Sequence, residues 1–493
     1  MKLAANSGVA DFIKNLNNPT PGKLFQVFFD DGLLEHIVFQ TNLYANQTNL
    51  QKSKSTSITP TTKCEFMAFL GINILMGIKV LPSYRDHWSS SPDLHDPYIS
   101  QLMNVNRFSW ILGNLHLNDN EVMPKKGQPG FDKLFKLRPF LDVMQQKFEA
   151  CFSLTECGAI DESMIKFKGR SSLKQYLPKK PIKRGFKVWC LADGSGYLSK
   201  FQIYTGKQDN NVEKALGPRV VKDLCSGLEN KGHRIYFDNY FSSVNLLHDL
   251  KDKKINACGT INKNRKHLPT FSSDKQLKRG DYDYFVNNKG IATTKWKDKR
   301  AVFLISNFHN PQDTTTVKRK ARNGSIEDVP CPIMLTDYNA HMNAVDKFDQ
   351  KKSSYEIDRK SRKWWHRIFF YFVDACIVNS YIIYEKLGLP KMTLKNFRRK
   401  VVEHLVCETL THTNTKKRRS NPVVAAIREH KPYVPDNIRQ REAAHLPIRS
   451  SRRRCGHCST KSKQVRTKWM CTMCKVPLCL KDDKNCFIPF HKK

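Results

Sequence analysis

The sequence has no uninterrupted apolar run of about 18 residues, which is the length that a membrane-spanning helix needs. Its two most apolar stretches begin at Phe66 and Trp364; the first is too short, and His366, Arg367 and Asp374 interrupt the second. The first residues also lack an apolar segment followed by small residues, so secretion is not indicated. These absences favour buried helices and predict a protein without a membrane partner.

Acidic residues are scarce: 45 Asp and Glu against 84 Lys and Arg give a formal net charge of +39 over 493 residues. A surplus of this size repels itself unless a polyanion neutralises it, and DNA, RNA and anionic membranes are the common polyanions. The chain is 40% hydrophobic, which excludes disorder throughout. We therefore expect several domains with a nucleic-acid partner.

A disulfide framework is also lacking. Six of the 15 cysteines lie in residues 455–486, and the others are scattered singly. This distribution is typical of a reducing compartment with one metal-binding module. A DNA partner would place the protein in the nucleus, and the "KKRR" cluster at residues 416–419 has the composition of an import signal.

The expected secondary structure changes along the chain. Residues 22–155 carry apolar side chains at helical spacing, and from about residue 157 short β-prone runs alternate with turn residues. Residues 265–330 form a more polar group of expected strands, and helix returns from about residue 340 through the run that begins at Trp364. Residues 411–452 have little periodicity and read as a flexible basic linker. No repeat of 20 to 50 residues is found, which argues against a solenoid.

Three aspartates lie beside apolar runs. Asp161 follows the apolar pair Ala159–Ile160 inside a strand pattern, and Asp238 lies at the end of a β-prone run. Asp346 lies in a helical pattern with Asp349 on the same face. Two strand carboxylates and one helix carboxylate could meet at a divalent cation such as Mg²⁺, which prefers oxygen ligands. Each aspartate alone is more often a turn, cap or solvated residue. Glu162 alternates to the other side of the strand and is not expected to be a ligand.

A dense basic run follows Asp161 and could hold a polyanion against the carboxylates. Its members are Lys166, Lys168, Arg170, Lys174, Lys179, Lys180, Lys183, Arg184 and Lys187. The alternative for these residues alone is a solvated basic hairpin.

Several motifs together resemble the piggyBac family of transposases over residues 18–384. They are "AIDESMIKFKGRSSLKQYLPKKPIKRGFKVW", "RIYFDNYFSSVNLL", "CGTINKNRKHLP", "YNAHMNAVDKFDQ" and "SRKWWHRIFFYFVDACIVNSYIIY". By this resemblance Asp161, Asp238 and Asp346 match the three catalytic aspartates that hold Mg²⁺ or Mn²⁺, and Asp349 matches a nearby acid. Trp364 matches an aromatic residue near the flanking DNA, where it could stack on an unpaired base. Arg359, Lys360, Arg362 and Lys363 would hold the adjacent phosphates.

The resemblance implies an α/β architecture with an RNase H-like catalytic core of the DDE/D type. The helical dimerisation and DNA-binding domain would span residues 21–155 and 357–410, after a flexible lead at 1–20. The catalytic domain would span 156–264 and 330–356, the β-rich insertion 265–329, the basic linker 411–452 and the zinc finger 453–493.

The implied activity is cut-and-paste transposition by a homodimer on double-stranded DNA. The transposon end is nicked, the freed 3′-OH forms a hairpin on the other strand, and the reopened end joins a TTAA target. The alternative is a domesticated, non-catalytic DNA-binding protein derived from a transposase. Three retained aspartates favour the enzyme, because in a protein that only binds DNA such charges would repel the ligand.

The terminal cysteines follow the pattern C-x2-C-x12-C-x2-C-x4-C-x6-C-x4-H, and paired thiolates two residues apart are typical of tetrahedral Zn²⁺ sites. The candidate ligands are Cys455, Cys458, Cys471, Cys474, Cys479, Cys486 and His491. Two closed sites need eight ligands, and His457, Asp482 or Asp483 could be the eighth. The resemblance implies a cross-braced finger that reads the transposon end; a protein-interaction finger is the alternative.

Overall fold

The computed structural model describes residues 7–51, 58–178, 180–206, 213, 215–321, 324–361, 363–415 and 445–492. The chain forms two compact units, Met1–His412 and Thr413–Lys493. The start of the expected lead, Lys179, Arg362, the basic cluster at 416–419 and most of the expected linker lie outside the described residues. The finer domain division remains a prediction.

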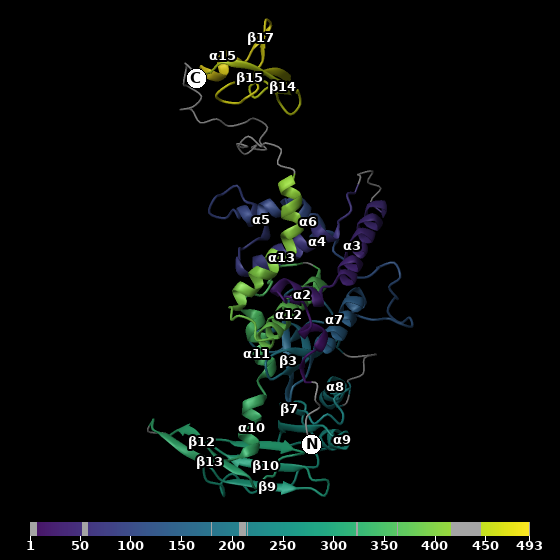
Figure 1. The fold of residues 1–493 in the computed structure, drawn as a ribbon, viewed down its shortest axis with the longest axis vertical. Coiled ribbons are helices and arrows are strands. Elements are labelled where there is room, and N and C mark those ends of the chain that lie inside the picture. Colours follow the sequence, from purple (N-terminus) through teal and green to yellow (C-terminus); the bar gives the residue numbers. More distant parts are fainter. Residues whose placement is uncertain are drawn as a thin grey trace. The chain divides into compact units, whose positions relative to one another are not determined.

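The first unit begins with a helical region (Figure 1). Its helices are α1 (Asp11–Lys14), α2 (Pro21–Phe28), α3 (Asp31–Gln51), α4 (Lys63–Ile78), η1 (Tyr84–Trp88), α5 (Pro97–Leu102), α6 (Val105–Asn114), η2 (Phe135–Leu137) and α7 (Arg138–Cys151). Capping residues determine where two of these helices begin. Thr20 caps α2, which has Pro21 in its first turn, and Thr62 forms a capping box with Glu65 at the start of α4. Short strands β1 (Gly8–Val9) and β2 (Phe152–Ser153) pair beside this region.

A nine-stranded sheet forms the centre of the first unit. Its strands are β3 (Cys157–Lys166), β4 (Gln175–Tyr176), β5 (Arg184–Asp193), β6 (Leu198–Ile203), β7 (Arg234–Phe237), β8 (Asn256–Thr260), β9 (Tyr282–Val286), β10 (Ala292–Lys297) and β11 (Ala301–Ser306). The order is β4-β5-β3-β7-β8-β11-β10-β9, with β6 on β5. Strand β3 is antiparallel to β5 and parallel to β7, and β7 is parallel to β8.

The expected insertion contributes to this same sheet, because β11 pairs with β8. Helices α8 (Leu216–Leu224) and α9 (Val244–Asp252) connect the strands that precede it. Beyond it, β12 (Thr314–Lys320) and β13 (Ile326–Pro332) form a separate two-stranded ribbon, and α10 (Ile333–His341) and α11 (Ala344–Ser353) lead the chain back to β3.

Helix α12 (Trp364–Lys386) is the core helix of the first unit, and α13 (Leu394–Thr415) follows it. Figure 1 shows α12 inside the unit, and it contacts both α2 and α11. It is long and apolar enough to span a membrane, but 94% of its apolar window is buried by the rest of the protein. At its centre Asp374 forms a buried ion pair with Arg398 of α13, 2.8 Å apart.

The second unit contains β14 (Pro447–Arg454), β15 (Arg466–Cys471), β16 (Leu480–Lys481), β17 (Lys484–Asn485) and α15 (Phe487–His491). Strand β14 pairs with β15, and β16 pairs with β17. Its core is small and consists largely of cysteines, with Val476 and Leu478 among them. Because β14 starts at Pro447, the module begins before residue 453, inside the stretch that the sequence indicated as linker.

Candidate active site and metal-binding module

Two of the predicted aspartates lie on adjacent parallel strands, Asp161 within β3 and Asp238 directly after the end of β7. Ile160 of β3 and Phe237 of β7 are register partners, so Asp161 and Asp238 are the next residues on strands that lie about 4.8 Å apart. Strand β7 ends there, and the backbone N–H of Tyr240 donates to Asp238 Oδ1 at 2.9 Å. The sheet topology therefore brings together two carboxylates that are far apart in sequence.

Helix α11 brings the third aspartate to this edge. It packs against β3 and β5, and Lys347 Nζ donates to the carbonyl oxygen of Gly194 at 3.1 Å. Gly196 has a φ of +91° and a Cβ there would lie 3.2 Å from the backbone N of Phe348, so this close approach requires glycine. Asp346 lies exposed in the first turn of α11.

Lys180 connects the acids electrostatically. Its Nζ lies 3.2 Å from Glu162 Oε1 and 3.9 Å from Asp161 Oδ1, and Asp346 also contributes to raising its pKa. The expectation that Glu162 points away from Asp161 is wrong: the two carboxyl groups interact directly and share Lys180. On its β7 side β3 has no partner beyond Ile160, and the Lys180 ammonium lies within 3.9 Å of both carboxyl groups.

The carboxyl groups of this edge have shifted pKa values. Burial raises the pKa of Asp161 to about 7, against the attraction of Lys180, and burial also raises the pKa of Asp238. Burial acts in the same direction on Glu162, but Lys187 and Lys180 outweigh it and lower the pKa of that carboxyl. In the Asp161–Glu162 pair the proton therefore belongs to Asp161, because the lysines favour the ionised glutamate.

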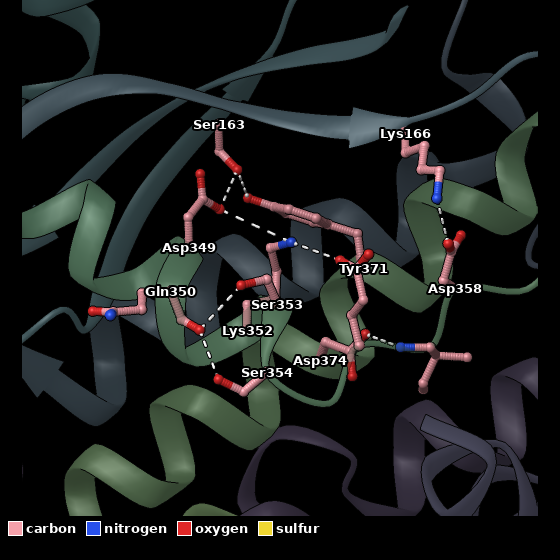
Figure 2. A network of polar contacts seen from close by, with 12 residues as sticks. Ser163, Lys166, Asp349, Gln350, Lys352, Ser353, Ser354, Asp358, Tyr371 and Asp374 are labelled. Carbon is pink, nitrogen blue, oxygen red and sulfur yellow. Dashed lines mark hydrogen bonds and ion pairs between the residues drawn. The ribbon is translucent and has the colours of Figure 1, made fainter. Parts of the chain in front are cut away.

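Asp349 lies in a separate hydrogen-bond network. The Ser163 hydroxyl donates to Asp349 Oδ1 at 2.6 Å, and the Tyr371 hydroxyl of α12 donates to Ser163 Oγ at 3.0 Å (Figure 2). Lys352 Nζ lies 3.9 Å from Asp349 Oδ1, and burial raises the pKa of Asp349. The network links α11 to β3 and α12, so it supports the helix that carries Asp346.

A cavity of about 960 Å³ opens beside the acids. Acidic and basic side chains line it together: Glu162, Asp346, Asp349 and Glu356 with Lys166, Lys168, Lys180, Lys183, Arg184 and Lys352. Lys168, Lys183 and Arg184 are exposed. Arg170, exposed, and Lys174, half-buried, lie on the same β3–β4 connection outside the lining. Five members of the predicted basic run therefore face the same space as Glu162 and Asp346, whereas Asp161 and Asp238 are not part of its lining.

Lys187 of that run is buried on β5 rather than exposed to a ligand. Its Nζ lies 3.9 Å from Glu162 Oε2 and 4.8 Å from the centre of the Tyr240 ring. Burial lowers its pKa. In this structure Lys187 neutralises Glu162, and the prediction that it contacts phosphate is wrong for this arrangement.

Arg359 is a second correction, because it is only 8% exposed. Its guanidinium lies over the rings of Tyr84, Phe108 and Phe370, with Cζ 5.1 to 5.7 Å from the ring centres, and it donates to Asn73 Oδ1. Cation–π contact with three rings compensates for lost water. Arg359 cannot reach a phosphate from this position.

The other predicted DNA contacts near Arg359 differ in their exposure to solvent. Lys360 is exposed, whereas Lys363 is half-buried, donates to the carbonyl oxygen of Gly113, and has a pKa that burial lowers to about 8. Trp364 is half-buried and packs edge-on against Phe186, with ring centres 6.1 Å apart. Only Lys360 of these three presents a free surface here.

The described residues contain two groups in which three or more His, Cys, Asp or Glu ligand atoms lie within 4.8 Å of one another, and both are in the second unit. Asp161, Asp238 and Asp346 do not form such a group. Their oxygen donors suit a hard divalent cation, and Asp161 and Asp238 are half-buried while Asp346 is exposed. In this structure Lys180 compensates part of their charge.

The second unit has one group of His445, Cys471, Cys474 and His491 and another of Cys455, Cys458, Cys479 and Cys486. The two groups alternate along the chain, which is the cross-braced arrangement that the family resemblance implies. All seven predicted ligand residues lie in these two groups, and the eighth member is His445 rather than His457, Asp482 or Asp483.

The spacing within both groups fits a tetrahedral ion. Sulfurs bound at about 2.3 Å to one zinc ion lie about 3.8 Å apart on a tetrahedron, and Cys458 Sγ and Cys479 Sγ are 3.8 Å apart. Cys474 Sγ lies 3.1 Å from His445 Nδ1 and 3.4 Å from His491 Nε2. His491 Nδ1 pairs with the carbonyl oxygen of Phe487 at 2.7 Å, which leaves Nε2 for the metal.

Sequence reasoning missed His445 because it lies ten residues before the first cysteine of the motif, in a stretch without periodicity. The number of candidate metal ligands could have pointed to His445. Seven ligands leave one site incomplete, and His445 is the nearest histidine before the motif.

The chain is similar in sequence to transposases and to transposase-derived proteins. A family model described as transposase IS4 matches residues 20–381. The human PiggyBac transposable element-derived protein 3 is 28% identical over 482 residues, covering 96% of this chain and 76% of that protein. The human PiggyBac transposable element-derived protein 2 is 30% identical over 374 residues, covering 73% of this chain and 61% of that protein.

Among solved structures, the cryo-EM structure of a piggyBac transposase synaptic complex with hairpin DNA matches with a TM-score of 0.72. The alignment covers 96% of this chain and 98% of that chain at 21% sequence identity, so the likeness concerns the fold.

Proposed function

The chain belongs to the piggyBac-type family of transposases, and from this premise we propose that it catalyses cut-and-paste excision and integration of DNA at TTAA sites. The observation that carries the proposal is the placement of Asp161 and Asp238, one residue beyond register partners on adjacent parallel strands, beside a cavity lined by lysine and arginine. The carboxylates can hold metal while the basic side chains attract the DNA.

An RNase H-like catalytic core is part of this proposal. The order β6-β5-β3-β7-β8, with three antiparallel strands followed by two parallel ones, supports it. In such a core Asp161 and Asp238 come from the two central parallel strands and Asp346 from the helix packed over them.

The proposed cofactor of the catalytic site is Mg²⁺ or Mn²⁺, held by Asp161, Asp238 and Asp346. When bound, such ions activate the attacking oxygen and stabilise the leaving oxygen of a phosphodiester. The protein's own groups have separate tasks. Asp161 must release its proton to become a ligand, since burial raises its pKa to about 7, and Lys168, Lys183 and Arg184 hold the DNA backbone against the site.

For the second unit we propose two Zn²⁺ ions. Four cysteines at one site, and two cysteines with two histidines at the other, form the donor sets that zinc prefers in structural sites. The unit has little apolar core, so metal binding would supply much of its folding energy. Exposed arginines on β14 support recognition of the transposon end by this unit.

Nuclear localisation and a homodimer on double-stranded DNA belong to the same proposal. Both follow from the activity, because the substrate is chromosomal DNA and two transposon ends must be held together. The solved relative is described as a synaptic complex with hairpin DNA, which supports the same assembly here.

The second candidate is a DNA-binding protein without catalysis. One observation favours it: in this structure the ammonium of Lys180 lies against the carboxylates, and the three aspartates are not gathered tightly enough to enclose an ion. The two candidates make different predictions for the fate of bound DNA.

The deciding experiment begins with the genomic DNA on both sides of the coding region. Inverted repeats bounded by TTAA would provide the substrate for a cleavage assay with the full-length protein and Mn²⁺. We expect nicking and hairpin formation by the wild type, and binding without cleavage by Asp161→Asn. Wild-type binding without any cleavage would overturn the transposase proposal in favour of the second candidate, and cleavage by Asp161→Asn would remove Asp161 from the site.

A further inference from the structure

Lys180 lies at the tip of the hairpin formed by β4 and β5. The hairpin closes through a hydrogen bond from the Leu177 N–H to the Lys183 carbonyl oxygen at 2.9 Å, and the Lys180 N–H donates to the Leu177 carbonyl oxygen at 3.2 Å. These bonds connect Leu177 with Lys180 and Lys183. From there the Lys180 side chain reaches Asp161 and Glu162.

The charges around Lys180 explain why its ammonium lies there. Its side chain is 31% exposed, whereas those of Asp161 and Glu162 are 14% and 15% exposed. Like charges of this kind destabilise one another when they are withdrawn from water. The buried Lys187 interacts with Asp161, Glu162 and Asp238. Lys180 interacts with Asp161, Glu162 and also Asp346, so its ammonium lies among the acids that a divalent ion would bind.

We propose that Lys180 is the internal counter-cation of the metal-free site: a divalent ion displaces it, and the released ammonium then binds a phosphate of DNA in the cavity. The inference rests on the proposed function, because it assumes that the aspartates hold metal. A divalent ion and an ammonium cannot both stay in contact with the same carboxylate pair without strong repulsion. Lys180 also lines the cavity that holds the other basic side chains, so a short movement of its side chain transfers it from carboxylate to phosphate.

This exchange couples two binding events. Metal releases Lys180 for DNA, and by thermodynamic reciprocity DNA that binds Lys180 must raise the affinity for metal by the same factor. An active site built in this way would be loaded with metal mainly when substrate is present.

The first test measures Mn²⁺ affinity without DNA, on full-length protein with its zinc sites loaded, by titration calorimetry. Lys180→Gln removes the competing cation, and Lys183→Gln is the matched control from the same hairpin tip. An opposite charge at this range shifts a carboxylate equilibrium by about tenfold or more. We therefore expect Lys180→Gln to bind Mn²⁺ about tenfold more tightly than the wild type, with Lys183→Gln unchanged.

The second test measures DNA affinity with and without Ca²⁺, which permits binding without cleavage. Lys180→Gln should match the wild type without metal and bind several-fold more weakly than the wild type with it. Lys183→Gln should weaken binding by the same factor in both conditions, because its ammonium is already exposed to solvent. Lys180→Arg should retain the coupling, since the charge is kept.

The outcomes separate this inference from the proposed function. If the wild type has an Mn²⁺ site that Asp161→Asn removes, but Lys180→Gln binds Mn²⁺ no more tightly, the displacement mechanism is wrong and the metal site stands. If the wild type shows no Mn²⁺ site that depends on Asp161, the metal site of the proposed function fails and this inference fails with it.

Discussion

His445 provides a direct test of the second unit, because the structure and the sequence motif make different predictions about it. We expect His445→Ala to lose one of two bound zinc ions, since it removes one of four ligands from the group with Cys471, Cys474 and His491. The matched control is His457→Ala, which changes an exposed histidine of the same unit and should keep both ions.

The size of the effect follows from the ligand count. Structural zinc sites bind with about 10 to 16 kcal/mol, so one ligand in four accounts for roughly 3 kcal/mol, or on the order of a hundredfold in the dissociation constant. The remaining group of four cysteines has its own complete ligand set and should retain its ion.

The assay is zinc content per chain by atomic emission, after dialysis against a chelator whose affinity lies between those of the intact and the three-ligand site. The wild type and His457→Ala should retain two ions and His445→Ala one. Two ions in His445→Ala, or the loss of one in His457→Ala, would refute the assignment of the eighth ligand.

Three further predictions concern the first unit. Burial raises the pKa of Asp161 from its ordinary value of 3.8 to about 7, so stability that is fully present below pH 3.8 is lost progressively as the pH rises from there to 7. In urea denaturation without Mg²⁺ or Mn²⁺, Asp161→Asn should therefore be more stable than the wild type at pH 8 and similar to it near pH 3.8. Lys168→Gln should reduce the slope of log affinity against log salt for DNA by about 0.9, whereas Arg359→Gln should leave it unchanged because that guanidinium is buried. Arg398→Met leaves the buried Asp374 carboxylate without its ion pair and should lower the free energy of unfolding by about 3 to 5 kcal/mol. The control Arg399→Met changes an exposed neighbour and should lower it by less than about 0.5 kcal/mol. Equal losses in the two variants would contradict the buried ion pair.

The helices, strands and candidate acids were accessible from the sequence because their signals are local. An aspartate directly after an apolar β-prone run is visible without a structure, and both Asp161 and Asp238 lie where such runs predicted. What the sequence could not provide is the neighbour of each strand. Strand β3 lies between β5 and β7, and that order alone places the two carboxylates side by side.

The errors come from rules that ignore distant contacts. Strand alternation placed Glu162 on the far side from Asp161, but the rule takes no account of Lys180, whose ammonium lies within 3.9 Å of both carboxyl groups. Arg359 was assigned to DNA because the family resemblance places Trp364 near the flanking DNA and Arg359 is close to it in sequence. Its burial depends on rings such as Tyr84 and Phe108, which lie more than two hundred residues earlier and carry no local sign of this role.

The hydrogen bond between Ser163 and Asp349 joins residues 186 positions apart in sequence. During translation, at about 5 to 20 residues per second, β3 therefore leaves the ribosome roughly 10 to 40 s before α11. The apolar faces that α12 later covers stay open to other chains throughout this interval, so the nascent protein should depend on chaperones. Asp346 lies on α11, so an incomplete chain that ends before this helix carries Asp161 and Asp238 without Asp346.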